Sequence, residues 1–531
     1  RRKGPRVADR LLVVEESVGA VEEAETPAVR EREDDVVRRQ VHSRDAAEVG
    51  GRFAHKRRVV LDVAVAHGLR DRHPRALRDV VEVDAERGRN RPAVPQTPVF
   101  TVDTGETRAR KLAWLRGKLD EGKVDGILLT ALDDIAWTLN VRASDIEYNP
   151  FVISYLLVTS DYAKWYVLRD GVEDAGTGST LDALHAEGIG ICPYADVELD
   201  LSQFEGRLQV DGDTLNYHLS RALGADVVMA PSPVQLRKAV KNAVEIAGMR
   251  SCHIRDGIAM EKFLYWLERS VEAQTCITEW DASERLGKFR ADMEGYRGDS
   301  FETISAYGPG AALPHYVTPR EDAPVLYGGG LYLVDSGGQY LDGTTDITRT
   351  VPLGRCSRQE REDYTLVLKA HIDLAMAVFP YGTAGCQLDA VARGPLWRAR
   401  RNFGHGTGHG VGFFLGVHEG PADIRQNFNR QALLPGMILS DEPGIYREGR
   451  HGVRHENLLL VLEGESNEFG RWLEFETLTM CHFDTSAIER KLLTQEEIDW
   501  LNAYNAKVYG TLKGLLPPAV SAWLKKKTEA I

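Results

Sequence analysis

The sequence predicts a mixed fold in which an α/β domain is followed by an α+β domain. Amphipathic helices alternate with short apolar strands in the first, while a long helical stretch and then strands with Gly-rich turns make up the second. A chain of 531 residues also exceeds one ordinary core, so we expect two or three domains. We place these domains at 96–235 and 236–510, after an atypical segment at 1–95 and before a tail at 511–531.

The first 95 residues differ in composition from the rest of the chain. Arg, Val, Ala, Glu and Asp dominate, and Phe53 is the only aromatic residue before Phe100. A packed domain normally fills its core with Ile, Leu, Tyr and Trp. We interpret the segment as a disordered, charge-rich extension, or as a GC-rich gene stretch translated in the wrong frame in place of a first domain. Peptides from residues 1–90 in the natural protein would exclude the second interpretation.

The α/β pattern begins after a Pro-containing linker at 91–100. TRARKLAWLRGKLDEGKVDGILLTALDDIAWTLN (107–140) predicts a helix, a Gly-containing turn, the strand GILLT and a second helix. Further strands are expected at SYLLVTS (154–160) and AKWYVL (163–168), and the alternation continues to about 235.

The α+β region opens with one helical stretch, from QLRKAV to WLERSV (235–271). Strands and Gly-rich turns dominate 300–350 and 403–465. A capping box at Thr494 and Glu497 starts a final helix, and the tail WLKKKTEAI is expected to be a solvated helix end.

Composition excludes several classes of protein. The net charge of −13 argues against nucleic acid as the main partner, because phosphate binding needs a basic surface. No run of eighteen apolar residues and no apolar leader is present, so neither a membrane span nor secretion is indicated. The six cysteines are widely spread without a CxxC pair, and no N-x-[ST] acceptor occurs. We therefore expect free thiols and a cytoplasmic protein.

Five potential metal ligands follow one another in the second half of the chain: Asp335, Asp346, His409, Glu442 and Glu456. Four carboxylates and one imidazole form an oxygen-rich set suited to two divalent ions that share bridging carboxylates. Asp335 ends the apolar strand LYLVDSG, and Asp346 begins a Thr-rich strand. Two antiparallel neighbours would place both carboxylates on one sheet face, although Asp in such contexts also often caps a turn.

The other three candidates lie in NFGHGTGHGVG, SDEPG and VRHEN. His405 and His409 are four apart, but the interleaved glycines exclude a helical zinc pair and HExxH is absent. These glycines would let the backbone approach a ligand or ion, or simply form a turn. Glu442 at its strand end is either a ligand or a solvated loop residue. Glu456 lies in an apolar strand with Arg454 on the same face, where the alternative is a structural ion pair.

Together the motifs resemble the pita-bread metallopeptidases, in the order D-x10-D, HGTGH, DEPG and R-x-E-N. GPGAALPHY, HGTGHGVGFFLGVHEGP and DEPGIY are most similar to the Xaa-Pro aminopeptidases (aminopeptidase P) of the large cytosolic three-domain type. TALDDIAWTLNVRASDIEYNPFVISYLLV resembles the creatinase-like second domain of that family. The resemblance extends from about residue 91 to the final helix, and residues 1–90 do not share it.

The resemblance implies a metalloaminopeptidase that hydrolyses the bond between an N-terminal residue and a following proline. Asp346 and Glu456 would bridge two ions, expected to be Mn²⁺, with Asp335 on one ion and His409 and Glu442 on the other. A hydroxide activated by the metals would attack the carbonyl, and Glu442 would carry its proton to the leaving proline nitrogen.

The resemblance also implies roles for neighbouring residues. His315, His405 and His418 would line the cleft and stabilise the oxyanion, and Tyr446 would border the cleft. Arg454 would orient a bridging carboxylate. His455 stands where the family usually has an apolar residue, and its alternation to the opposite face should affect packing more than chemistry.

The implied partners are peptides with proline at the second position and a second copy of the chain in a homodimer. One alternative function is that of a prolidase, which cleaves Xaa-Pro dipeptides with the same ligand types. The other is a pita-bread binding protein that has lost catalysis. Such proteins usually lack several ligands, whereas all five are present in this chain.

Overall fold

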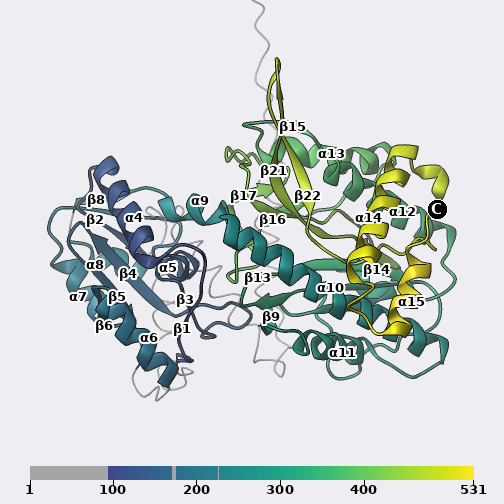
Figure 1. Cartoon of the computed structure of the whole chain (residues 1–531), viewed down its shortest axis with the longest axis horizontal. Helices are drawn as coiled ribbons and strands as arrows, with labels where there is room; N and C mark the ends of the chain where they lie inside the picture. The colour runs from purple at the N-terminus through teal and green to yellow at the C-terminus, as the bar shows by residue number, and fades with distance from the viewer. Residues whose placement is uncertain (1–93, 170–174, 225) are drawn as a thin grey trace, which may run out of the picture. The chain divides into compact units, whose positions relative to one another are not determined.

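Figure 1 shows the computed structural model of the chain, which describes residues 94–169, 175–224 and 226–531. These residues belong to a single compact unit. The interpretations of the atypical N-terminal segment, up to residue 93, lie outside the described residues.

The first described domain is built on a six-stranded mixed sheet with the order β6-β5-β4-β2-β7-β8. Antiparallel pairing joins β2, β4 and β5, whereas the outer neighbours pair in parallel. The predicted helices and strands at 107–168 are confirmed. The strands are β2 (Gly126–Leu129), β4 (Ser154–Thr159), β5 (Ala163–Val167), β6 (Ile189–Pro193), β7 (Arg207–Val210) and β8 (Asp226–Met229). The helices are α4 (Arg108–Gly122), α5 (Leu132–Leu139), α6 (Ala175–Ala186), α7 (Asp196–Ser202) and α8 (Tyr217–Ala222), and a short pair, β1 (Phe100–Thr101) with β3 (Val141–Arg142), adjoins them.

The helical stretch predicted at 235–271 is two helices, α9 (Pro233–Ala239) and α10 (Ala243–Glu272). Asn242 separates them, because its side chain accepts hydrogen bonds from the backbone N–H groups of Val244 and Glu245. The Glu245 carboxylate in turn accepts from the N–H of Asn242, which completes a capping box. The prediction of one continuous helix missed this break.

The second domain contains two main sheets, one of three strands (β10-β11-β14) and one of six (β15-β22-β21-β18-β16-β17). Smaller sheets join β19 with β20, and β9 with β12 and β13. The strands are β9 (Tyr296–Asp299), β10 (Ile304–Tyr307), β11 (Leu331–Ser336), β12 (Gly338–Tyr340), β13 (Gly343–Thr344), β14 (Ile347–Pro352), β15 (Phe379–Pro380), β16 (Gly408–Gly410), β17 (Glu419–Ile424), β18 (Ile438–Asp441), β19 (Gly444–Arg447), β20 (His451–Arg454), β21 (Asn457–Asn467) and β22 (Gly470–Thr477). The helices are α11 (Glu279–Ala291), α12 (Arg358–Ala375) and α13 (Gly385–Arg398).

The C-terminal helices pack against the second domain. α14 (Gln495–Leu512) begins at the predicted Thr494–Glu497 capping box. The tail is a helix end, α15 (Pro518–Lys527), as predicted, but it is only partly solvated, because Trp523 and Leu524 are buried in the largest apolar core. The stretch reads as polar since its lysines are prominent, yet its apolar residues share one helix face.

Two expectations from composition can be compared with the structure. All six cysteines are free thiols, as predicted. In the part of the chain that the structure describes, no helix combines the length and the apolar character that a membrane crossing requires.

Candidate metal centre

Asp335 and Asp346 lie on the pair of antiparallel strands that the sequence predicts. Asp335 is opposite Thr348 in the register of β11 and β14, and Asp346 stands two residues before Thr348. Because side chains alternate along a strand, Asp346 and Thr348 point to the same side of the sheet. The structure therefore brings the two carboxylates together, as expected.

His409 and Glu442 come from neighbouring strands of the six-stranded sheet. His409 is the central residue of β16, and Glu442 directly follows β18. The N–H of Glu442 donates to the carbonyl of Thr407 at 2.8 Å, and the Ser440 hydroxyl donates to the Glu442 carboxylate at 3.1 Å. The N–H of His409 donates to the same Ser440 hydroxyl at 3.0 Å, so Ser440 links the two candidate ligands.

Glu456 lies between β20 and β21, so VRHENLLLVLE is not the single strand that we predicted. The backbone N–H of Glu456 donates to the carbonyl of Thr348 at 3.1 Å, which diverts the chain towards β14. His455 points the other way, as expected. Its buried ring packs 4.5 Å from the ring of Tyr364 and 5.4 Å from that of Phe483.

The five predicted ligands form overlapping groups of donor atoms. Asp335, Asp346 and Glu456 offer atoms within 4.8 Å of one another, and so do His409, Glu442 and Glu456. His409 Nε2 lies 3.5 Å from Asp346 and 3.3 Å from Glu442. Glu456 belongs to both groups and Asp346 also contacts the second, so these two carboxylates lie where two ions would share ligands.

The electrostatics of the site fit a pair of cations. Burial, reinforced by Asp335, raises the pKa of Asp346 well above its ordinary value, and burial with Asp346 does the same to the pKa of Glu456. Within the described residues, Oδ1 of Asp335 is buried without a hydrogen-bond partner. Crowded, buried carboxylates are unfavourable without compensating positive charge. The site therefore has the oxygen-rich donor atoms of a divalent metal centre, and its excess negative charge would be balanced by cations.

Contact between His409 and Glu442 shifts their pKa values in opposite directions. Burial alone lowers the pKa of His409, but Glu442 and Asp346 outweigh it and raise that pKa to about 9. Burial alone raises the pKa of Glu442, but the hydrogen bond and charge of His409 prevail and lower it to about 2. Glu442 is therefore ionised at neutral pH, as a metal ligand or a proton acceptor must be.

Arg454 corrects one expectation about the surrounding residues. Its Nη2 donates to Asp335 Oδ2 at 2.5 Å, and its Nε donates to Thr348 at 3.2 Å. Arg454 thus reaches Glu456 only through Thr348, whose hydroxyl donates to the Glu456 carboxylate at 2.7 Å. Both side chains nevertheless face the pocket, as predicted, and they meet at the Thr348 hydroxyl.

Thr348 and Ser440 are functional candidates that the sequence analysis missed. Each stands two residues from a predicted ligand, Thr348 from Asp346 and Ser440 from Glu442. Along a strand this spacing puts both residues on one face. The period of two would therefore have identified them.

The three predicted cleft histidines meet at one pocket of about 360 Å³. It is lined by all five metal-ligand candidates and by His315, His405 and His418, together with Phe301, Ile304, Pro314, Gly406, Gly408, Arg425 and Arg454. The His418 ring centre lies 4.2 Å from that of His409. The pocket therefore joins the metal centre to a row of hydrogen-bonding side chains.

Tyr446 has a supporting position instead of the predicted place at the cleft border. It is not among the residues that line the pocket. Its hydroxyl bonds His405 Nε2 at 2.7 Å and accepts from Arg454 Nη1 at 2.8 Å. Tyr446 thereby orients His405 from behind.

The glycines around His409 permit close packing of strands, and Gly406 and Gly408 also line the pocket, so the backbone approaches the candidate metal centre as predicted. A Cβ on Gly408 would collide with the backbone of Ser440, and one on Gly410 with the backbone of Glu419. Gly408 and Gly410 therefore let β16 pack tightly between its neighbours and bring His409 to the site.

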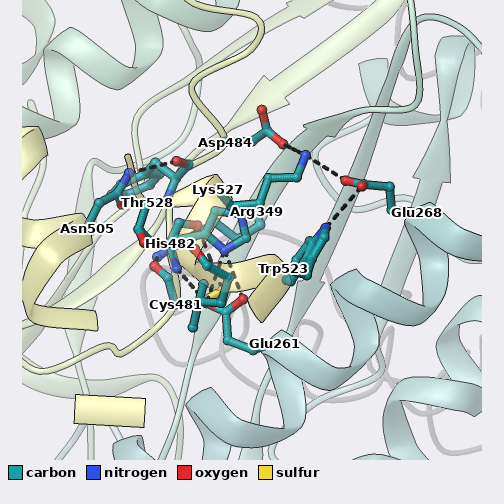
Figure 2. Close-up of polar contacts among 12 residues, drawn as sticks. Glu261, Glu268, Arg349, Cys481, His482, Asp484, Asn505, Trp523, Lys527 and Thr528 are labelled. Atoms are coloured by element: carbon teal, nitrogen blue, oxygen red, sulfur yellow. Dashed lines mark hydrogen bonds and ion pairs between the residues drawn. The ribbon is translucent and has the colours of Figure 1, made fainter. Parts of the chain in front are cut away.

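A second group of potential ligands, Glu261, Cys481 and His482, lies away from this pocket. The Glu261 carboxylate accepts from the backbone N–H of His482 at 2.9 Å and lies 2.9 Å from its ring Nδ1. Arg349 donates to the carbonyls of Cys481 and His482 at 2.6 and 3.1 Å. Figure 2 shows this network close to the Lys527–Glu268 pair. With its carboxylate engaged and a guanidinium adjacent, the group has the character of a structural ion cluster.

Comparison with known proteins covers nearly all of the described chain. Residues 90–245 match the Creatinase/Prolidase N-terminal domain, residues 247–463 match Metallopeptidase family M24, and residues 471–531 match the C-terminal region of peptidase M24. A probable Xaa-Pro aminopeptidase P from Fusarium vanettenii is 40% identical over 476 residues, which cover 85% of this chain and 76% of the relative. The corresponding protein from Laccaria bicolor is 38% identical, with 84% and 71% covered.

Solved structures agree with these sequence relationships. X-prolyl aminopeptidase from Caenorhabditis elegans, described as a cytosolic enzyme with a di-nuclear active site, is 35% identical with a TM-score of 0.80. The match covers 84% of this chain and 75% of the other. Xaa-Pro dipeptidase from Bacillus anthracis is 26% identical with a TM-score of 0.56, over 71% of this chain and 99% of the other.

Proposed function

This chain belongs to metallopeptidase family M24, among the Xaa-Pro aminopeptidase P proteins, and from that premise we propose that it removes the N-terminal residue of peptides whose second residue is proline. It has the creatinase-like domain and the pita-bread domain of that family. The more similar solved structure is an aminopeptidase, which favours this activity over that of a prolidase.

One observation carries the proposal: the donor groups of the centre overlap at Glu456, with Asp346 beside both. Glu456 and Asp346 would be shared by two ions, Asp335 would complete one, and His409 with Glu442 would complete the other. An oxygen-rich set of this kind suits Mn²⁺, which we propose as the metal. When bound, such a pair supplies an activated water and polarises the scissile carbonyl.

The protein's own side chains bind and orient the peptide. His418 lies beside His409 in the pocket, where it is placed to donate to the peptide carbonyl. His405 also lines the pocket, but its two ring nitrogens bond the Tyr446 hydroxyl and the carbonyl of Gly406. His315 enters the same pocket from the segment after β10. Glu442, ionised because His409 lowers its pKa, accepts a proton at its carboxylate and delivers it to the proline nitrogen.

The assembly and location of the protein are further parts of the proposal. We propose a homodimer, as in the three-domain proteins that the sequence resembles. A cytoplasmic location is supported by the C. elegans neighbour, which is described as cytosolic. Light scattering on the purified protein tests the dimer, and fractionation of cells tests the location.

The central experiment measures metal content and peptide cleavage on one preparation. Chelated protein is reloaded with Mn²⁺, Zn²⁺ or Mg²⁺ and assayed on Xaa-Pro-Pro, Xaa-Pro and Xaa-Ala-Pro. We expect two ions per chain, the highest activity with Mn²⁺, and preference for Xaa-Pro-Pro. Preference for the dipeptide would instead indicate a prolidase. Less than one ion per chain with no hydrolysis would indicate a binding protein.

A further inference from the structure

The chain between β16 and β17 is a loop (residues 411–418) in which 411–417 are buried and His418 is exposed. Its apolar side chains, Val411, Phe413, Phe414, Leu415 and Val417, are all buried. Leu415 belongs to the apolar core of the first described domain, although the loop belongs to the second. The loop thus links two candidate site residues to the interior of a different domain.

Phe414, in the middle of this loop, has a left-handed backbone conformation with φ of 47°. Bulky residues rarely adopt this conformation, because the side chain crowds the backbone. It persists only where the surroundings hold it in place. The position of the loop is therefore imposed from outside.

Arg142, at the end of β3, supplies that restraint. Its fully buried guanidinium donates to the carbonyls of Ala136 and Val141, both at 2.9 Å, in its own domain. It also donates to the carbonyls of Phe413, at 3.0 Å, and Phe414 in the loop. One rigid, planar group thus connects the two domains through four carbonyls, which a lysine cannot reproduce.

Other polar contacts hold the rest of the loop. Gln339 donates to the carbonyl of Leu415 at 2.7 Å and to that of Tyr148 at 3.1 Å. Lys238 of α9 lies 2.7 Å from both Asp133 and Glu419. Glu419 directly follows His418 and accepts from the N–H of Gly416 at 2.9 Å.

We propose that Arg142 is a positioning residue for His418, acting through the 411–418 loop. The inference rests on the proposed peptidase function, in which His418 contacts substrate. Arg142 lies outside the pocket-lining residues, so its effect must pass through the loop backbone. Loss of Arg142 frees Phe413 and Phe414 and displaces His418 relative to the metal centre.

A double-mutant cycle with Arg142→Met and His418→Ala tests this on the full chain. We expect Arg142→Met to lower kcat/KM on Xaa-Pro-Pro at least about tenfold at unchanged metal content, and Arg142→Lys to lower it less. In the His418→Ala background, Arg142→Met should cause no further loss. Losses that multiply, or full activity of the folded Arg142→Met variant, would overturn the inference.

Arg169→Met is the matched control. Arg169 belongs to the same domain, its side chain is only 5% exposed and pairs with Asp145 at 2.9 Å, and among the described residues it has no hydrogen bond to the loop. The kcat/KM of the Arg169→Met variant, per folded molecule, should stay within about twofold of wild type. If Arg142→Met does not fold, Phe414→Gly replaces it, since glycine accepts a positive φ while removing the packed ring. Phe414→Gly should likewise lower kcat/KM in the wild-type background and cause no further loss in the His418→Ala background.

A spectroscopic readout separates failure of this inference from failure of the proposed function. In histidine-labelled protein, the ring signal of His418 is assigned by its loss in His418→Ala. It should shift in Arg142→Met and stay in place in Arg169→Met. If the wild type is inactive but the His418 signal shifts in Arg142→Met, the proposed peptidase function is wrong and the positioning role stands. If the wild type is active and the signal does not shift, only the positioning role is wrong.

Discussion

His409 Nε2 lies 3.3 Å from Glu442 Oε1, and this contact joins the only imidazole among the five ligand candidates to the proposed proton carrier. The imidazole keeps the buried carboxylate ionised, and the carboxylate keeps the imidazole basic. Each residue therefore depends on the other for its state before any metal binds.

Glu442→Gln removes this negative charge while preserving the shape of the side chain. We expect kcat to fall by roughly 10²–10⁴, because both a metal ligand and a proton carrier are lost. Circular dichroism should match wild type, because the fold is retained. Near-normal kcat would contradict the role of Glu442.

Metal binding should release protons. The pKa of His409 is raised to about 9 in the metal-free protein, and those of Asp346 and Glu456 are also raised, so protons occupy the site at pH 7. Ligands must lose these protons to bind an ion. Titration calorimetry of Mn²⁺ into chelated protein, in buffers of different ionisation enthalpy, should report net proton release, and a thermal melt of the loaded protein should show a raised Tm. A heat that is independent of buffer would refute this.

His418→Ala should lower turnover without emptying the metal centre. The ring lies beside His409 in the pocket but is outside the five proposed ligands. We expect a loss in kcat of about 10²-fold, comparable to that from removing one oxyanion donor. Metal analysis of the same sample is the control, and loss of an ion would reassign His418 as a ligand.

Thr348→Val removes the hydroxyl that donates to Glu456 and keeps the shape of a β-branched residue. Partners behind metal ligands typically contribute 10- to 100-fold to affinity, so we expect weaker metal binding by about that factor. Competition with a chelator measures it. Thr350→Val, on the same strand, is the control, because its hydroxyl bonds a backbone carbonyl of Arg454 instead.

Asp363, which is not one of the metal-ligand candidates, should make the free energy of unfolding depend on pH. Burial alone would raise its pKa, but His451, at 3.0 Å, and Arg447 lower that pKa to about 2. A depressed carboxylate pKa stabilises the fold above the unfolded value near 4, and this contribution disappears as the pH falls from about 4 to 2. Asp363→Asn should cost about 2 kcal/mol at pH 7 in urea unfolding, with the difference narrowing at pH 3.

Asp226→Asn is the control for this measurement. Asp226 is an exposed carboxylate, 3.5 Å from Arg207, and exposed pairs contribute little. An equal effect of both substitutions, or an Asp363→Asn effect that does not vary with pH, would contradict the assignment.

Periodic patterns were the parts of the structure that sequence could predict. The period of two along β11 and β14 placed Asp335 and Asp346 on one side, and the capping box at Thr494 located the start of α14. Both features depend on neighbours within a few residues. The overlap of donor atoms at Glu456 depends on strands more than one hundred residues apart, and only the family resemblance anticipated it.

Two of the errors come from tertiary contacts that override a local pattern, and a third comes from a local capping box within a helical pattern. VRHENLLLVLE looks like one strand, but the bond from the Glu456 N–H to Thr348 breaks it. The helical stretch at 235–271 breaks at Asn242, where a good cap outweighs continuation. Tyr446 was expected at the cleft because of its place in DEPGIY, yet its hydroxyl is taken by His405 and Arg454.

The insertion of Leu415 into the core of the neighbouring domain has a consequence for how this protein can vary. A mutation in that core changes the packing of the 411–418 loop, which lies next to two site histidines, His409 and His418. The core itself contributes none of the five metal-ligand candidates. Natural selection for turnover should therefore constrain both domains together, and a creatinase-like domain exchanged from a distant relative would need its own matching loop.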